Sequence, residues 1–154
     1  MLPKHILVPT DLSEGAEQAL GYACELARKL GAQIHLLNVI SIPALGVPEL
    51  GLALTATMID QMVVDNQRAI DRLAQTRCNA DVGQVLVKTG DARDVINQTA
   101  KELGIDLIVM GTHGRRGISR ALLGSVAETV VRSAPCAVLT VRLRELDDSD
   151  RHAA

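Results

Sequence analysis

Short apolar runs alternate with longer segments in which apolar residues recur at spacings of three and four along almost the whole chain. The runs predict strands, and the longer segments predict amphipathic helices. Strands are expected at residues 5–9, 34–39, 82–88, 107–110 and 137–143, and helices at residues 13–30, 54–77, 91–103 and 123–133. Regular alternation of the two is typical of a parallel sheet with helices on both faces. We therefore predict an α/β fold with a single open five-stranded parallel sheet.

The core of this fold must be aliphatic. The chain has one Tyr and no Phe or Trp, so its interior is left to Leu, Ile, Val, Ala and Met. The same shortage excludes the stacked-base platforms of single-strand binders and aromatic cages for quaternary amines. In the predicted helix at 54–77, the residues expected to face the core are Met58, Ile59, Met62, Ala69, Ile70 and Leu73.

Charge and cysteine usage narrow the class of protein further. Sixteen basic and 18 acidic residues leave a net charge of −2, so we expect neither nucleic acid nor an anionic membrane as a partner. No uninterrupted apolar run is long enough for a membrane span, and the N-terminus lacks a secretory signal. Cys24, Cys78 and Cys136 form no CxxC pair. We expect buried free thiols in a reducing cytoplasm.

The predicted elements define one domain over residues 1–144. Residues 40–53 contain two Pro and two Gly, and their position after the second predicted strand suits a lid. Residues 145–154 are acidic and are expected to form a disordered tail.

The loop after the fourth predicted strand carries the strongest functional signal. Ligands of open parallel sheets bind beyond the carboxyl ends of the strands, where the strand order reverses. Here three glycines lie within seven residues, at 111–117, and Gly124-Ser125 opens the next predicted helix. Glycines allow a bulky anion to approach the backbone, and a helix N-terminus offers unbonded N–H groups. Together with Arg115, Arg116 and Arg120, this pattern predicts a phosphate cradle.

Two common phosphate signatures do not fit this loop. A P-loop requires Lys before the Ser that opens the helix, and no Lys precedes Ser125. The dinucleotide fingerprint follows the first strand, whereas these glycines follow the fourth. Neither a Walker-type NTPase nor a nicotinamide dehydrogenase is supported.

The glycine spacing Gly-x2-Gly-x9-Gly-Ser resembles the ATP-binding branch of the universal stress protein family. Pro9-Thr10-Asp11 after the first predicted strand and Asn38-Val39 at the end of the second also resemble it, and the likeness covers about residues 3–144. It implies a Rossmann-like sheet of strand order 3-2-1-4-5. It also implies bound ATP with Mg²⁺, and a cytoplasmic homodimer formed through Cys136–Arg142 that acts in stress resistance or signalling. The nucleotide-binding residues that the resemblance implies are Pro9, Thr10, Asp11, Val39, Met110, Gly111, His113, Gly114, Arg115, Gly124, Ser125 and Val126.

Several of these residues have structural alternatives. Asp11 and Ser125 are each followed three residues later by Glu, so either could cap the helix behind it. Val39 could be a core residue, and Cys136 is interpreted as a packing residue. Two other functions also stay open: a slow ATPase or phosphotransferase in which His113 or Asp11 positions water, and a dimerisation module without nucleotide. No acid–base pair is evident, so no catalytic residue is predicted.

Overall fold

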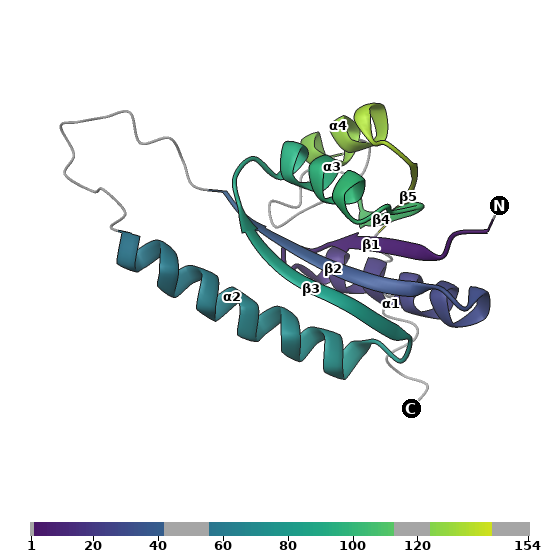
Figure 1. The fold of residues 1–154 in the computed structure, drawn as a ribbon, viewed down its shortest axis with the longest axis horizontal. Coiled ribbons are helices and arrows are strands. Elements are labelled where there is room, and N and C mark those ends of the chain that lie inside the picture. The colour runs from purple at the N-terminus through teal and green to yellow at the C-terminus, as the bar shows by residue number, and fades with distance from the viewer. Residues whose placement is uncertain (1, 42–55, 113–123, 143–154) are drawn as a thin grey trace, which may run out of the picture.

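The computed structural model describes residues 2–41, 56–112 and 124–142 (Figure 1). Its strands are β1 (His5–Pro9), β2 (Gln33–Ile40), β3 (Asp81–Thr89), β4 (Leu107–Gly111) and β5 (Ala137–Val141). Its helices are α1 (Glu14–Leu30), α2 (Ala56–Arg77), α3 (Ala92–Glu102) and α4 (Ser125–Ser133). The strands form one parallel sheet in the order β3-β2-β1-β4-β5, which confirms the predicted fold class and strand order.

Helices cover both faces of the sheet, so each inner strand is buried on both sides. α1 and α2 pack on one face, in an apolar cluster that includes Ile6, Val8, Leu36 and Val109. α3 and α4 pack on the other face, in a cluster that includes Leu7, Leu37, Ile108 and Met110. Residues on one strand alternate between the two clusters, as strand geometry requires. This burial explains the unbroken apolar sequence of β1 and β4. None of the helices in the described residues is long and apolar enough to cross a membrane.

The ends of α1 and α3 are set by side chains and by one glycine. Ser13 caps α1, and its hydroxyl accepts a hydrogen bond from the N–H of Ala16. Gly31 ends α1 in the left-handed conformation, with φ of 65°. Asp91 caps α3 by accepting from the N–H of Arg93. The side chain that caps α1 is thus Ser13 and not Asp11, which the spacing had indicated.

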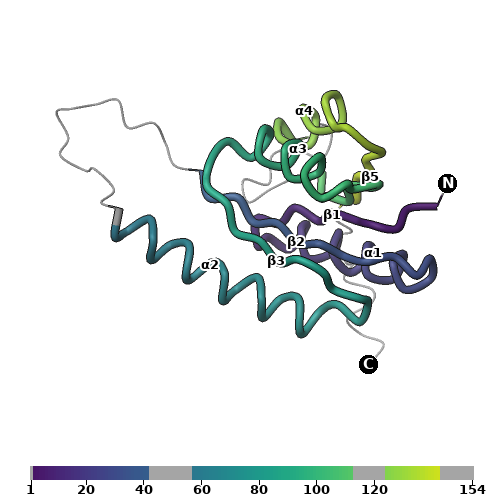
Figure 2. The backbone as a smooth tube through the Cα atoms, in the orientation of Figure 1, coloured from purple at the N-terminus to yellow at the C-terminus, as the bar shows by residue number. Residues whose placement is uncertain are grey.

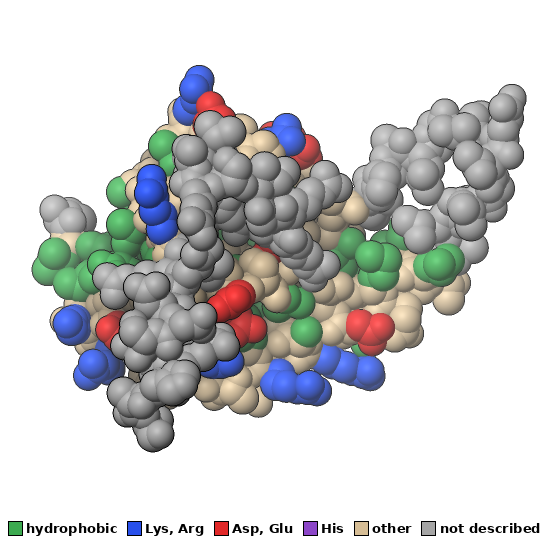
Figure 3. Space-filling view, turned by 180° about the vertical axis from the view of Figure 1, so that it is seen from behind, with side chains coloured by type: hydrophobic (Ala, Val, Ile, Leu, Met, Phe, Trp, Pro, Cys, Tyr) green, Lys and Arg blue, Asp and Glu red, His purple; other side chains and the backbone are tan. Residues whose placement is uncertain are grey.

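The prediction that Met58 and Met62 face the core is wrong. Their exposed fractions are 52% and 39%, whereas Ile70 and Leu73 on the same helix are buried. The N-terminal turns of α2 extend past the carboxyl ends of β2 and β3, so no strand lies beneath them (Figures 1 and 2). Hydrophobic side chains are therefore exposed to solvent along the N-terminal turns of α2 (Figure 3).

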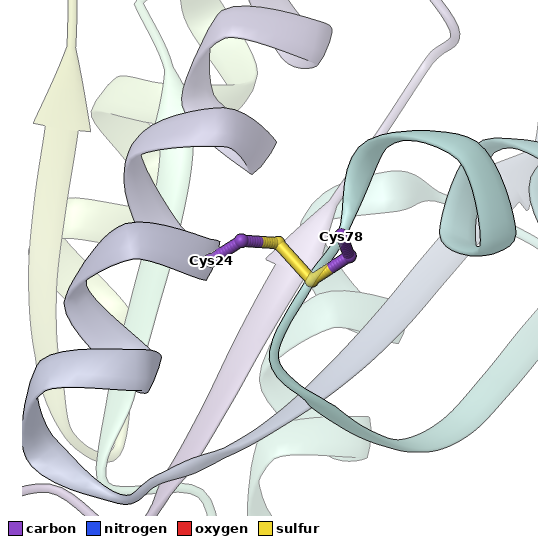
Figure 4. The surroundings of a disulfide bond; sticks show 2 residues. All are labelled: Cys24 and Cys78. Atoms are coloured by element: carbon purple, nitrogen blue, oxygen red, sulfur yellow. A yellow bond between two sulfur atoms is a disulfide. The ribbon is translucent and has the colours of Figure 1, made fainter.

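The prediction that all three cysteines are free thiols is also wrong. Cys24 of α1 and Cys78, which directly follows α2, form a disulfide, while Cys136 is a free thiol (Figure 4). The predicted burial of Cys24 and Cys78 is correct, since both belong to the cluster beneath α1 and α2. Burial raises the pKa of Cys136, which keeps its thiol protonated and agrees with a packing role.

His35 is expected to make the protein less stable as the pH falls below neutrality. Its buried ring accepts a hydrogen bond at Nδ1 from the N–H of Gln84 (3.1 Å), and its Nε2 lies 3.3 Å from Nδ1 of His5. Burial and the nearby His5 lower the pKa of His35 from its ordinary value of 6.5, and Asp81 opposes this shift. The unfolded chain therefore binds the proton first, so stability is complete above the ordinary pKa and declines as the pH falls through and below it.

Urea unfolding at about pH 7.5 and about pH 5.5 measures this effect, because the two values bracket the ordinary His pKa. The midpoint should be lower at the acidic pH, and the difference should shrink in His35→Gln. Equal midpoints in the unaltered protein would contradict the predicted pH effect. A difference that His35→Gln leaves unchanged would show that another group is responsible.

Candidate functional site

Strand β1 separates from β4 at its carboxyl end. Pairing of these strands covers only Ile6 with Leu107 and Leu7 with Ile108. The N–H of Thr10 donates to a carbonyl of β2, so the backbone of Thr10 faces β2. The direction of the backbone groups alternates along a strand, so the backbone of Pro9 faces β4. Proline has no N–H with which to extend the ladder on that side. The strands therefore part where the strand order reverses, which is where ligands of open parallel sheets bind.

The turn after β1 is held by its own side chains. The hydroxyl of Thr10 accepts from the N–H of Leu12 (3.1 Å), and Asp11 Oδ1 accepts from both the N–H and the hydroxyl of Ser13. Leu12 has a φ of 62°, which only a constrained turn imposes on a bulky residue. The alternative in which Asp11 caps α1 is wrong, because Ser13 is the cap and Asp11 holds Ser13.

The backbone of Val39 faces the open end of β1. The N–H of Thr10 donates to the carbonyl of Leu37 (2.8 Å), so Leu37 faces β1. The N–H of Gly90 donates to the carbonyl of Ile40 (3.1 Å), so Ile40 faces β3. Because the direction of the backbone groups alternates along a strand, the N–H and carbonyl of Val39 point toward β1. They lie beyond Pro9, the last residue of β1 that pairs with β2. These two groups form a donor–acceptor edge at the candidate site.

Aliphatic side chains from three elements line the same face of this edge. Met110 on β4 is buried in the cluster beneath α3 and α4, and Val39 on β2 and Val126 on α4 pack against that cluster while remaining partly exposed. The sequence prediction named all three, and the structure brings them together. They offer an apolar surface for a flat ligand in a protein with almost no aromatic residues.

Among the described residues, no side chain caps the start of helix α4 at this edge. Gly124 is its N-cap residue, and the N–H of Gly124 donates to the carbonyl of Thr112 (2.8 Å). Ser125 is the first helical residue, and its side chain is exposed. The alternative in which Ser125 caps the helix is therefore wrong. A helix start with no capping side chain leaves N–H groups and the positive end of the helix dipole for an anion.

Gly111 has a structural role that the glycine motif does not reveal. A Cβ at this position would lie 3.0 Å from the carbonyl oxygen of Gly15 in the first turn of α1. Gly111 thus lets the first turn of α1 approach the end of β4 closely.

Gly111→Ala is expected to destabilise the fold by about 1 to 3 kcal/mol, because backbone atoms of α1 must move to admit the methyl group. Gly21→Ala is a matched control: a Cβ there meets nothing within 4 Å, and Ala should stabilise α1 by about 0.5 to 1 kcal/mol. Urea unfolding of both variants tests this. A stable Gly111→Ala variant would contradict the close approach of α1 to β4.

The remaining predicted residues lie partly outside the described part of the chain. Pro9 and Thr10 are buried at the end of β1, and Asp11 is half-buried beside them. His113, Gly114 and Arg115 lie outside the described residues, as do Arg116, Gly117 and Arg120.

Sequence reasoning missed three contributors to this edge. Ser13 caps α1, and the backbone of Thr112 joins β5 to the start of α4 through bonds to Val141 and Gly124. Asn38 is buried and donates from Nδ2 to the carbonyl of Thr10 (2.8 Å). The signal for Asn38 was present, since an amide near the end of a buried, largely apolar strand needs a polar partner.

An open parallel sheet in the order β3-β2-β1-β4-β5, with helices on both faces, defines a Rossmann-like α/β protein whose strand order reverses at this edge. The family model for the universal stress protein family matches residues 3–142, so the chain belongs to that family. Universal stress protein A homolog 2 of Coxiella burnetii is 32% identical over 142 residues, covering 92% of this chain and 96% of the relative.

Solved structures agree with this assignment. Universal stress protein UspA from Lactobacillus plantarum has a TM-score of 0.74 and 29% identity, covering 90% of this chain and 97% of that chain. A universal stress protein solved in complex with cAMP has a TM-score of 0.66 at 22% identity, covering 92% of this chain and 98% of that chain. At that identity the second likeness concerns the fold alone.

Proposed function

We propose that this universal stress protein binds adenine nucleotides, and ATP with Mg²⁺ in particular, at the carboxyl edge of its sheet. The observation that carries the proposal is the donor–acceptor edge of Val39, which lies beside the open end of β1 and faces it. A likeness of fold to a protein solved with cAMP is consistent with it. The glycine spacing at Gly111, Gly114 and Gly124-Ser125 adds a place for phosphates.

The backbone edge of Val39 is complementary to adenine. Its N–H can donate to the ring N1 of adenine, and its carbonyl can accept from the exocyclic amino group. Guanine carries a donor at N1 and an acceptor at the exocyclic position. The N–H of Val39 would then face a donor, and its carbonyl would face an acceptor. The side chains of Val39, Met110 and Val126 would contact the base face without ring stacking. Asp11 would lie near the ribose.

The phosphates would extend toward the start of α4. Gly124 has no side chain to block an anion, and no side chain in the described part of the chain caps the first N–H groups of α4. His113, Gly114 and Arg115 complete this part of the proposed site. The Mg²⁺ ion would be held mainly by the phosphate oxygens, as is common for this ion.

The proposed assembly is a homodimer that pairs β5 with its copy. β5 is an outer strand of the sheet, and its apolar residues are only partly buried. Apolar edge strands tend to pair with another chain. Light scattering should then give twice the mass of the chain at micromolar concentration, and a monomer would contradict the dimer.

We further propose a cytoplasmic role in stress resistance or signalling. Disulfides are typical of oxidising compartments. In cell extracts quenched with an alkylating agent, free thiols at Cys24 and Cys78 would support the cytoplasmic location, and a disulfide between them would contradict it.

Isothermal titration calorimetry with Mg²⁺ tests nucleotide binding. ATP should bind at micromolar to submillimolar concentration, and GTP should bind more weakly. Absence of heat for ATP at millimolar nucleotide would refute the proposal. Mass spectrometry of small molecules released by denaturation should also identify an adenine nucleotide that purifies with the protein.

A further inference from the structure

The carbonyl of Thr10 is bound by a side chain where a regular ladder would use the backbone. The N–H of Thr10 donates to Leu37, so parallel pairing would direct the N–H of Val39 to the carbonyl of Thr10. Instead, Nδ2 of Asn38 donates to that carbonyl at 2.8 Å, and the pairing of β1 with β2 ends at Pro9 and Leu37. In the described part of the chain, no hydrogen bond joins the N–H of Val39 to Thr10.

The amide oxygen of Asn38 has no hydrogen-bond partner among the described residues. Asn38 is only 4% exposed, and its Oδ1 is buried without a hydrogen-bond partner in the described residues. An unpartnered buried polar atom destabilises a fold, whereas an apolar residue of similar size avoids that penalty. With Leu at this position, the carbonyl of Thr10 could take the N–H of Val39, and the ladder would extend by one residue. Asn38 therefore does not serve stability best, and a role in the site accounts for it better.

We propose that Asn38 is a positioning residue that keeps the N–H of Val39 available to adenine. The side chain of Asn38 donates to the carbonyl of Thr10, so the N–H of Val39 does not donate to that carbonyl within the sheet. The selectivity of the proposed site for adenine over guanine then depends on Asn38, whose side chain donates to Thr10 after β1. This inference rests on the proposed nucleotide site, so its first test uses the protein without nucleotide.

The first test is NMR of the ¹⁵N-labelled protein with Asn38→Leu. The amide proton of Val39 should move downfield and exchange with solvent at least about tenfold more slowly, because it now donates to Thr10. The melting temperature should stay equal or rise. Thr99→Val is the matched control: it removes another buried oxygen without a partner, on α3, and should leave the Val39 amide unchanged. If Asn38→Leu does not fold, Asn38→Val gives the same readout on a residue type that strands favour.

The second test is calorimetry of the same variants with ATP and GTP. Asn38→Leu should bind ATP about three- to tenfold more weakly, which corresponds to one hydrogen bond, and should lose most of its preference over GTP. Thr99→Val should bind both as the unaltered protein does. A Val39 amide unchanged in Asn38→Leu, or an unchanged ATP-to-GTP ratio, would overturn the role of Asn38. If the unaltered protein binds no nucleotide, the proposed function fails, while the Val39 amide still decides whether Asn38 controls that N–H.

Discussion

Reduction of the Cys24–Cys78 disulfide is expected to lower the free energy of unfolding by about 4 kcal/mol. The bond joins residues 54 apart, so it removes much of the conformational freedom of the unfolded chain. It also ties α1 to the end of α2, which an exposed ion pair between Glu17 and Arg77 (3.3 Å) reinforces only weakly. Urea unfolding with and without a phosphine reductant measures the loss.

The matched variants separate the disulfide from the cysteines themselves. Cys24→Ala with Cys78→Ala should be as unstable as the reduced protein and should not respond to reductant. Cys136→Ala removes the free thiol and should keep the response to reductant. Equal unfolding midpoints in the oxidised and reduced protein would contradict a stabilising disulfide, and two free thiols at these positions by mass spectrometry would contradict the bond itself.

Ser125→Glu is expected to weaken ATP binding without harming the fold. Ser125 is exposed at the first position of α4, where a carboxylate interacts favourably with the helix dipole and should stabilise the helix by about 0.3 to 1 kcal/mol. The same carboxylate would repel a phosphate bound there. At a separation of about 7 Å and an effective dielectric constant of about 20, the repulsion is about 2 kcal/mol, or roughly thirtyfold in affinity.

Two comparisons isolate the charge from the change of shape. Ser125→Gln has nearly the same shape as Glu, and should bind ATP within about threefold of the unaltered protein, since a neutral amide adds no such repulsion. Adenosine carries no phosphate, so its affinity should be equal in all three proteins. Equal ATP affinity in the Glu and Gln variants would place the phosphates away from α4, and weaker adenosine binding in Ser125→Glu would indicate a steric effect.

The fold was predictable because burial on both faces leaves a clear mark on the sequence. Ile6-Leu-Val8 and Leu107–Met110 have no polar member, and only inner strands of a covered parallel sheet require that. The amphipathic pattern of α2 identified its inward side correctly at Ile70 and Leu73. It could not reveal that the sheet ends before Met58, since periodicity describes a helix and not the extent of its partner.

The error at the start of α1 is local, whereas the disulfide and the bond from Asn38 depend on contacts between residues far apart in the sequence. The spacing of Asp11 and Glu14 fits a capping box, but the cap is Ser13, two residues further on, because Asp11 bonds to Ser13 itself. The pairing of Cys24 with Cys78 depends on where α2 ends relative to α1, which no local pattern contains. The bond from Asn38 to Thr10 likewise joins two strands, and its consequence for Val39 follows only from the register.

Titration of the ¹⁵N-labelled protein with ATP and Mg²⁺ tests the central claim most directly. Amide resonances of Val39, Thr112 and Ser125, at the carboxyl edge, should shift progressively and saturate. Those of His5, Gln33 and Asp106, at the opposite edge of the sheet, should stay in place. Unchanged resonances at the carboxyl edge with millimolar ATP, or shifts confined to the opposite edge, would contradict an adenine nucleotide site there.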